Sequence, residues 1–275
     1  MPPHPTAGLS KLPAVTLAFW IMKISATTLG ETLGDLLSKG PEHGGIGLGY
    51  LAASLIVLGI FLATLIPQLL TRRLIPFLYW AVILSTSTAG TTISDFMDRT
   101  LGLGYAKGSA ILVAFLIASL AVWRLVEGSI SVGSVRTRRA EAFYWFAILC
   151  SNTLGTALGD YLADEEQGPG LGFIGGAACI GALIALIAAI HLISRRLKVA
   201  SASLTVGLFW AAFVLTRPFG ATFGDVLARG RDEGGLGFGP GGSSAVLAAI
   251  LVGMILWASR RTDARGPAAG TDAAL

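Results

Sequence analysis

Residues 20–35 of the chain read WIMKISATTLGETLGD, and the recurrence of this stretch decides the fold. It starts with tryptophan, has glycine ten residues later and ends with aspartate fifteen residues after the tryptophan. The later copies read WAVILSTSTAGTTISD (80–95), WFAILCSNTLGTALGD (145–160) and WAAFVLTRPFGATFGD (210–225). The four tryptophans, spaced 60, 65 and 65 residues apart, are Trp20, Trp80, Trp145 and Trp210. Self-similarity of this kind predicts one structural unit repeated four times.

The composition indicates an integral membrane protein. The 275 residues are 53% hydrophobic and 13% charged, with a mean hydropathy of +0.72, whereas a soluble domain carries about 25% charged residues. Apolar runs near the roughly 20 residues needed to cross a bilayer recur along the chain. The plainest of them are residues 51–70, 110–123, 174–193 and 245–257. A very hydrophobic soluble bundle is the less favoured interpretation.

We predict an all-α polytopic bundle of eight transmembrane helices, two per copy, forming one membrane domain over residues 1–275. The expected helices are 13–37, 49–70, 75–98, 104–126, 141–163, 171–193, 203–228 and 241–259. The repeats cover about 12–70, 74–126, 140–193 and 203–259, and a disordered tail is expected over 262–275. An even number of crossings per copy makes the copies parallel, so we expect the tryptophan-bearing helices inside and the plain helices outside.

The distribution of Lys and Arg predicts the orientation. One set of loops and termini holds thirteen basic residues and the opposite set holds five. By the positive-inside rule, both termini are expected on the cytoplasmic side of a bacterial inner membrane, with the aspartates toward the outer face. The net charge of +4 follows from this bias and gives no indication of a nucleic-acid partner. Whether the chain forms a homo-oligomer stays open.

A polar stripe runs along the first helix of every copy. Positions 0, 7, 11 and 15 from the tryptophan lie on one narrow helical face, and polar groups at membrane depth face protein or water. We therefore predict that the stripe points to a shared interior, where it forms a substrate- or ion-binding site. Its predicted site residues are Thr27, Glu31, Asp35, Ser87, Asp95, Asn152, Thr156, Asp160 and Asp225.

Beside the polar stripe runs a stripe of small residues spaced four apart. Small residues at this spacing let helix backbones approach closely. The glycines predicted to pack helices together are Gly30, Gly34, Gly90, Gly155, Gly159, Gly220 and Gly224. A glycine-punctuated turn follows each aspartate, and we interpret it as a turn or hinge, because a phosphate-binding loop requires a preceding strand.

This organisation resembles a family of bacterial membrane proteins defined by four tandem two-helix repeats, each with a hallmark tryptophan. The resemblance covers essentially the whole chain. It implies the fold and little chemistry, because the family is named for its repeat. The second copy departs from the pattern through a shorter turn, with Gly102 only 22 residues after Trp80.

Ionisable residues unique to one copy are the sharpest functional candidates, because charges at membrane depth are costly. Glu31 is expected to be a cation or proton site, or to form an ion pair with Arg217 or Lys23, and the two interpretations are compatible. Lys23 and Arg217 are accordingly predicted to serve in charge pairing or coupling. The four tryptophans are expected either to pack the bundle or to gate its inner end.

The four aspartates allow two interpretations. They could simply cap their helices and form turns, or converge into a negative mouth that concentrates cations. Carboxylate and hydroxyl oxygens suit hard ions such as Mg²⁺ or Mn²⁺, and Glu31 with Asp35 is the candidate metal pair. No resident cofactor is expected.

These residues favour a transporter that moves a cation, with a divalent metal as one concrete version. The alternatives are a proton-coupled transporter of a small anionic or organic solute, supported by Lys23 and Arg217, and a non-transporting membrane sensor or assembly protein. An enzyme is not expected. The Gly-x-Gly-Asp motif of intramembrane aspartyl proteases is missing, since Thr32 and Ala157 stand at its first position, and His191 is isolated.

Overall fold

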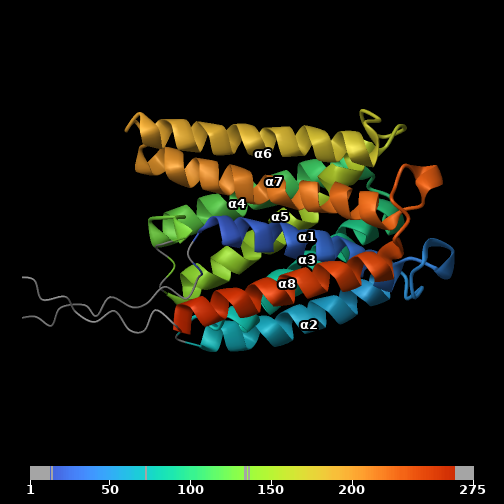
Figure 1. Ribbon diagram of the computed structural model, residues 1–275, viewed down its shortest axis with the longest axis horizontal. Helices are drawn as coiled ribbons and strands as arrows, with labels where there is room; N and C mark the ends of the chain where they lie inside the picture. Colours follow the sequence, from blue (N-terminus) through green and yellow to red (C-terminus); the bar gives the residue numbers. More distant parts are fainter. Residues whose placement is uncertain (1–12, 14, 72, 133–134, 136, 264–275) are drawn as a thin grey trace, which may run out of the picture.

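The computed structural model describes residues 13, 15–71, 73–132, 135 and 137–263, which form eight α-helices and no strand. The helices run side by side along the long axis of the molecule (Figure 1). They are α1 (Leu17–Ser38), α2 (Tyr50–Leu70), α3 (Pro76–Asp95), α4 (Tyr105–Glu127), α5 (Arg138–Ala163), α6 (Gly172–Arg196), α7 (Ala202–Ala228) and α8 (Gly239–Asp263).

Five of these helices, α2, α4, α6, α7 and α8, are long and apolar enough to cross a membrane. They support the predicted membrane protein. Helices α1, α3 and α5 do not meet this criterion of length and hydropathy. Their sequences are rich in Ser and Thr, and α1 and α5 also carry several charged residues. These side chains are mostly buried inside the protein, so average hydropathy understates how well the three helices fit the bundle.

The four helices that carry the tryptophan motif form a closed inner ring. Helix α1 packs on α3, α3 on α5, α5 on α7, and α7 again on α1. The other four helices lie outside this ring and expose many large apolar side chains. The polar faces of the inner helices are thereby gathered around one common axis.

The outer helices interlock the copies. Each packs chiefly on the inner helix of the following copy, so that α2 covers α3, α4 covers α5 and α6 covers α7. Helix α8 of the last copy covers α1 of the first, which closes the circle and places these two helices side by side in Figure 1. A single two-helix copy therefore buries little of its own surface, and most burial comes from its neighbours.

Two helices begin at other residues than the sequence predicted, because a threonine caps the N-terminus of each. Helix α1 begins at Leu17 because the Thr16 hydroxyl accepts a hydrogen bond from the Phe19 N–H. Helix α5 begins at Arg138, since Thr137 caps it in the same way. Helix α8 continues to Asp263, so the tail expected from 262 starts no earlier than 264, and residues 264–275 lie outside the described part.

The turns that follow the aspartates are built alike in the first and fourth copies. Each contains one turn of 3₁₀ helix, η1 (Pro41–His43) or η4 (Arg231–Glu233), and then folds back onto the last carbonyls of its helix. Gly47 and Gly237 have φ of 81° and 77°, a conformation that favours glycine. The second copy, with its shorter turn, instead extends α3 by the π-helical turn η2 (Phe96–Thr100).

Candidate binding site on the axis of the helix ring

A closed circle of eight aromatic side chains fills one end of the inner ring. In every copy, the aromatic residue before the tryptophan contacts its own tryptophan and the tryptophan of the next copy, with ring centroids 5.2–6.4 Å apart. The members of this aromatic circle are Phe19, Trp20, Tyr79, Trp80, Tyr144, Trp145, Phe209 and Trp210. All but Trp20 and Phe209 are buried. The tryptophan motif thus makes a continuous packing layer across the bundle.

The aromatic circle contains a hydrogen bond between two tyrosines whose contribution to stability can be measured by substitution. The hydroxyl groups of Tyr79 and Tyr144 lie 2.8 Å apart, and both side chains are fully buried. We expect Tyr79→Phe and Tyr144→Phe each to lower the free energy of unfolding by about 1–3 kcal/mol, because each leaves one buried hydroxyl without a partner. The double Phe variant should cost less than the sum, as measured by SDS-titration unfolding in mixed micelles; additive losses would contradict a paired contact.

Lys23 lies in an apolar layer next to the aromatic circle. The equivalent positions of the other copies hold Ile83, Ile148 and Phe213, all fully buried like Lys23. The Lys23 Nζ lies 4.2 Å from the centroid of the Phe213 ring, a cation–π arrangement, and forms no hydrogen bond with the described residues. No ion pair to Glu31 is formed, so the sequence-based alternative of a Lys23–Glu31 pair does not apply to this conformation.

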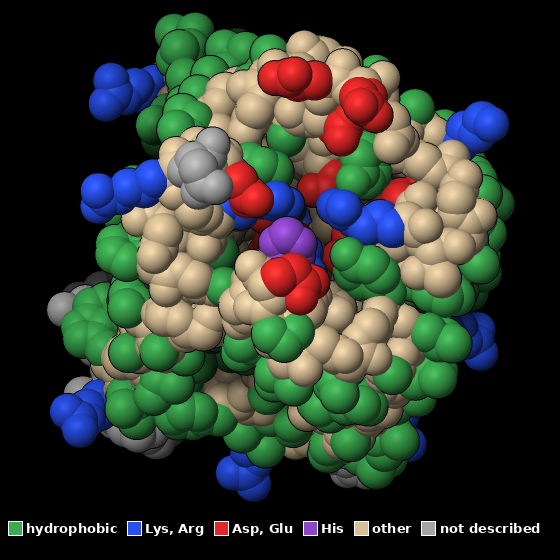
Figure 2. Space-filling model, turned by 90° about the vertical axis from the view of Figure 1, so that its right-hand side faces the viewer, with side chains coloured by type: hydrophobic (Ala, Val, Ile, Leu, Met, Phe, Trp, Pro, Cys, Tyr) green, Lys and Arg blue, Asp and Glu red, His purple; other side chains and the backbone are tan. Residues whose placement is uncertain are grey.

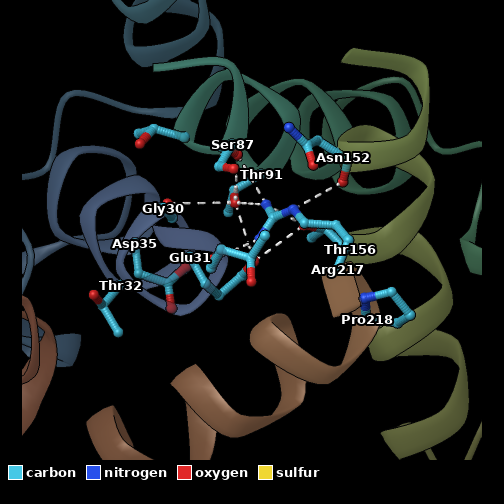
Figure 3. A network of polar contacts seen from close by, with 12 residues as sticks. Gly30, Glu31, Thr32, Asp35, Ser87, Thr91, Asn152, Thr156, Arg217 and Pro218 are labelled. Atoms are coloured by element: carbon cyan, nitrogen blue, oxygen red, sulfur yellow. Dashed lines mark hydrogen bonds and ion pairs between the residues drawn. The ribbon is translucent and has the colours of Figure 1, made fainter. Parts of the chain in front are cut away.

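Arg217 occupies the centre of the ring, seven residues after its tryptophan, and its side chain is fully buried (Figure 3). The guanidinium group donates to main-chain carbonyls at the same repeat position of the other three inner helices. Nε donates to Asn152 O at 3.1 Å, Nη1 to Thr27 O at 2.9 Å and Nη2 to Ser87 O at 2.9 Å. One side chain from α7 therefore joins α1, α3 and α5.

Glu31 is the charge partner of Arg217. Its Oε2 lies 3.4 Å from Arg217 Nη1 and accepts hydrogen bonds of 3.0 Å from the hydroxyls of Thr91 and Thr156. The two threonines stand eleven residues after their tryptophans, as Glu31 does. Arg217 Nη2 also donates to both threonine hydroxyls, so charge and hydrogen bonds form one network, here called the axial pair.

The structure brings Ser87, Asn152 and Thr27 to the axis, as the sequence predicts. Their main-chain carbonyls hold Arg217, which the sequence did not reveal, and the role of their side chains as ligands of an ion or solute stays a prediction. The Ser87 hydroxyl and the Asn152 amide have no hydrogen-bond partner among the described residues. The Thr27 hydroxyl bonds to carbonyls, including that of Thr216 on α7.

The glycine stripe lies at the helix contacts of the inner ring. A Cβ placed on Gly30 would lie 2.5 Å from Ser87 Cβ, and one on Gly90 would lie 2.8 Å from Asn152 Cβ. Gly155 faces Arg217 and Gly220 faces Thr27 in the same manner. One turn on, Gly34, Gly159 and Gly224 face Thr91, Ala221 and Glu31. Because the backbones meet this closely, Arg217 can reach three neighbouring carbonyls.

Beyond the axial pair, the four aspartates gather at the other end of the ring, but each is bound to a basic side chain. Lys39 Nζ lies 2.7 Å from Asp35 Oδ2, and Arg229 Nε lies 2.9 Å from Asp225 Oδ1. Arg99 joins two copies, with Nε 2.8 Å from Asp95 Oδ1 and Nη2 3.2 Å from Asp160 Oδ2. All four aspartates are therefore ion-paired where they converge, and the predicted role of this mouth in concentrating cations stays a prediction.

These basic side chains keep their charge. Burial alone would lower the pKa of Lys39, yet Asp35, Asp225 and Asp95 raise it above its usual value. The pKa of Arg99 is likewise raised by Asp95 and Asp160 against the effect of burial. Any cation entering this end must therefore compete with fixed positive charges.

A cavity of about 370 Å³ opens at this end, and we call it the end cavity. Figure 2 looks onto it and shows acidic and basic side chains around a hollow, with a histidine among them. Its charged and titratable lining residues are Asp35, Lys39, Glu42, His43, Tyr50, Arg99, Arg229 and Glu233.

The candidate metal pair, Glu31 with Asp35, does not form a preorganised metal site. Glu31 Oε2 is held by Arg217 and two threonines, and Asp35 Oδ2 is held by Lys39. Within the described ranges, no group of three or more His, Cys, Asp or Glu side chains is arranged to hold a metal ion.

Sequence reasoning missed Lys39, Arg99 and Arg229 as part of the site, because it counted them only as loop charges. A local signal was present. In three of the four copies a basic residue follows the aspartate by four positions, the spacing at which helical side chains pair. The third copy lacks it, and there Arg99 reaches across to Asp160.

The closed ring, the apolar outer helices and the fourfold motif define a membrane protein built from four tandem two-helix copies. The chain belongs to the family described as Repeat of Unknown Function (DUF347), which matches residues 18–74, 78–129, 143–197 and 208–263. This confirms the predicted membership in a four-repeat family. No curated protein and no solved structure matches the chain.

Proposed function

We propose that the protein is a proton-coupled transporter of a small charged organic solute, with all eight helices crossing the bacterial inner membrane. One observation carries this proposal: a buried charge pair lies on the axis of a closed helix ring, between the aromatic circle and the open end cavity. Alternating access requires a site that is exposed to one side of the membrane at a time. In this proposal, the end cavity gives one side its access to the axial pair.

Glu31 is the group in the axial pair suited to carry the proton. Arg217 stays charged at all physiological pH values, so only Glu31 can change its charge. A proton on Glu31 would remove its attraction to Arg217, while the threonine hydroxyls can rotate to follow the change. Protonation would thus loosen the contact that ties α1 to α7.

The direction of the cavity follows from the basic residues. The five Lys and Arg residues of the poorer set lie at the cavity end. Described members of the richer set, such as Arg124, Arg138 and Arg195, lie at the opposite ends of their helices. The positive-inside rule then places the end cavity outside, and the aromatic circle and both termini toward the cytoplasm. In this orientation the protein is open to the outside.

We expect Glu31→Gln to abolish coupled transport while the protein still inserts and folds, since the amide keeps the shape but cannot exchange a proton. Purified protein in liposomes with an internal pH-sensitive dye would be exposed singly to amino acids and small carboxylates. Solute-dependent proton entry is expected in the wild type and should fall to the level of empty liposomes in the variant.

The matched control is Glu166→Gln, because Glu166 is exposed in a turn outside the axial pair. It should transport like the wild type. Wild-type flux in Glu31→Gln would remove Glu31 from the mechanism. Absence of any solute- or cation-dependent flux in the wild type would favour the non-transporting sensor or assembly role.

A divalent cation is the second candidate substrate, favoured by the excess of acid at the open end. Six carboxylates face three Lys and Arg side chains in and below the end cavity, the acids being Asp35, Asp95, Asp160, Asp225, Glu42 and Glu233. An ion such as Mn²⁺ would have to displace Lys39 or an arginine to bind. Flux with MnCl₂ and with no organic solute would select this candidate.

A further inference from the structure

The end cavity differs from the axial pair in position and in chemistry. It is lined by the ends of α1 and α7, the turns η1 and η4, the first residues of α2 and α8, and Arg99. Its volume of about 370 Å³ lies in the range of small-molecule sites, about 300–1,000 Å³. A single metal ion would leave most of this space to water.

The basic side chains of the cavity retain hydrogen-bond donors. Lys39 donates once, to Asp35, and has three N–H groups. Arg99 donates to Asp95 and Asp160, and Arg229 to Asp225 and Glu233, while each guanidinium has five N–H groups. The remaining donors suit a carboxylate, which arginine binds with charge-assisted hydrogen bonds.

The same cavity offers acceptors for a cationic group. Asp35 is 3% exposed, and its Oδ1 has no hydrogen-bond partner among the described residues although its Oδ2 is paired with Lys39. Glu42 and Glu233 add carboxylates around the cavity. A buried carboxylate oxygen without a partner is costly, and an ammonium group would satisfy it.

We propose that the end cavity binds a zwitterionic amino acid, its carboxylate at Arg99 and Arg229 and its ammonium group at Asp35. This assignment rests on the proposed transport function and specifies its substrate class. A zwitterion satisfies both sets of unused groups at once. A purely anionic or purely cationic solute would use only one of these two sets.

Binding is tested on the purified full-length chain in lipid nanodiscs by isothermal titration calorimetry with each of the twenty standard amino acids. At least one amino acid should bind. Its deaminated and decarboxylated analogues should each bind about tenfold more weakly or worse, because each loses one set of charge-assisted bonds. Failure of all twenty to bind, or equal binding of a single-charge analogue or of MnCl₂, would overturn the assignment.

Two variants locate the site. Arg229→Gln and Asp35→Asn should each weaken amino-acid binding about tenfold or more, whereas Arg231→Gln, an exposed residue of η4 outside the cavity lining, should leave it unchanged. Equal affinity in all three variants would place the binding elsewhere. If a variant fails to fold, the analogue comparison on the wild-type chain still decides the matter.

Different results would contradict the transport proposal and the amino-acid binding proposal. Amino-acid binding without any solute-dependent proton flux would contradict transport and leave the binding site intact. Flux of another solute that depends on Glu31, with no amino acid bound, would contradict the zwitterion assignment and leave transport intact.

Discussion

Arg217→Met is expected to lower the free energy of unfolding by about 3–5 kcal/mol, the cost of removing one partner from a buried ion pair. Glu31 would lose its counter-ion in the ring, and three helices would lose the donor that joins their carbonyls. SDS-titration unfolding in mixed micelles measures the loss.

The matching control is the double variant Glu31→Gln with Arg217→Met. Replacing a whole buried pair by uncharged groups is often close to neutral, so the double variant should be more stable than Arg217→Met alone. A double variant that is more stable than Arg217→Met alone would confirm that Glu31 and Arg217 act as a unit. Simple addition of the two single losses would show that Arg217 stabilises the ring through the carbonyls alone.

Gly155→Ala is expected to lower the free energy of unfolding by about 1–3 kcal/mol through overpacking. A Cβ at this position would lie 2.5 Å from Arg217 Cβ and 3.0 Å from the Arg217 carbonyl carbon, so α5 and α7 would have to separate. The axial pair lies at this contact, and the variant should therefore also lose solute-dependent proton flux.

Gly207→Ala is the matched control, because Gly207 lies in α7 with nothing within 4 Å of an added Cβ. Alanine is the better helix former by about 0.8–1 kcal/mol, so this variant should be as stable as the wild type or more so. If Gly155→Ala proved equally harmless, the close approach of α5 and α7 would not be required for folding.

The sequence was sufficient to predict that the tryptophan-bearing helices lie inside and which face of each inner helix points to the axis. Motif spacing places Glu31, Arg217 and the aspartates at repeat positions that parallel helices bring to one axis, and the structure has them there. Hydropathy was a weaker guide, because α1 and α3 bury their Ser and Thr side chains inside the protein.

The contacts that could not be predicted from the sequence are made by main-chain groups, or by helix surfaces that are apolar on most sides. Main-chain carbonyls of Thr27, Ser87 and Asn152 hold Arg217, and every residue has such a carbonyl. The packing of each outer helix on the following copy was equally hidden. The outer helices are apolar on most of their surface, so their periodicity does not distinguish a lipid-facing side from a protein-facing one.

Because α8 packs on α1, the number of copies is fixed by closure. Open repeat arrays can lengthen by one unit, since each unit touches only its neighbours. Here a fifth hairpin would have to open the contact between α8 and α1 and widen the ring in which Arg217 contacts three neighbouring helices.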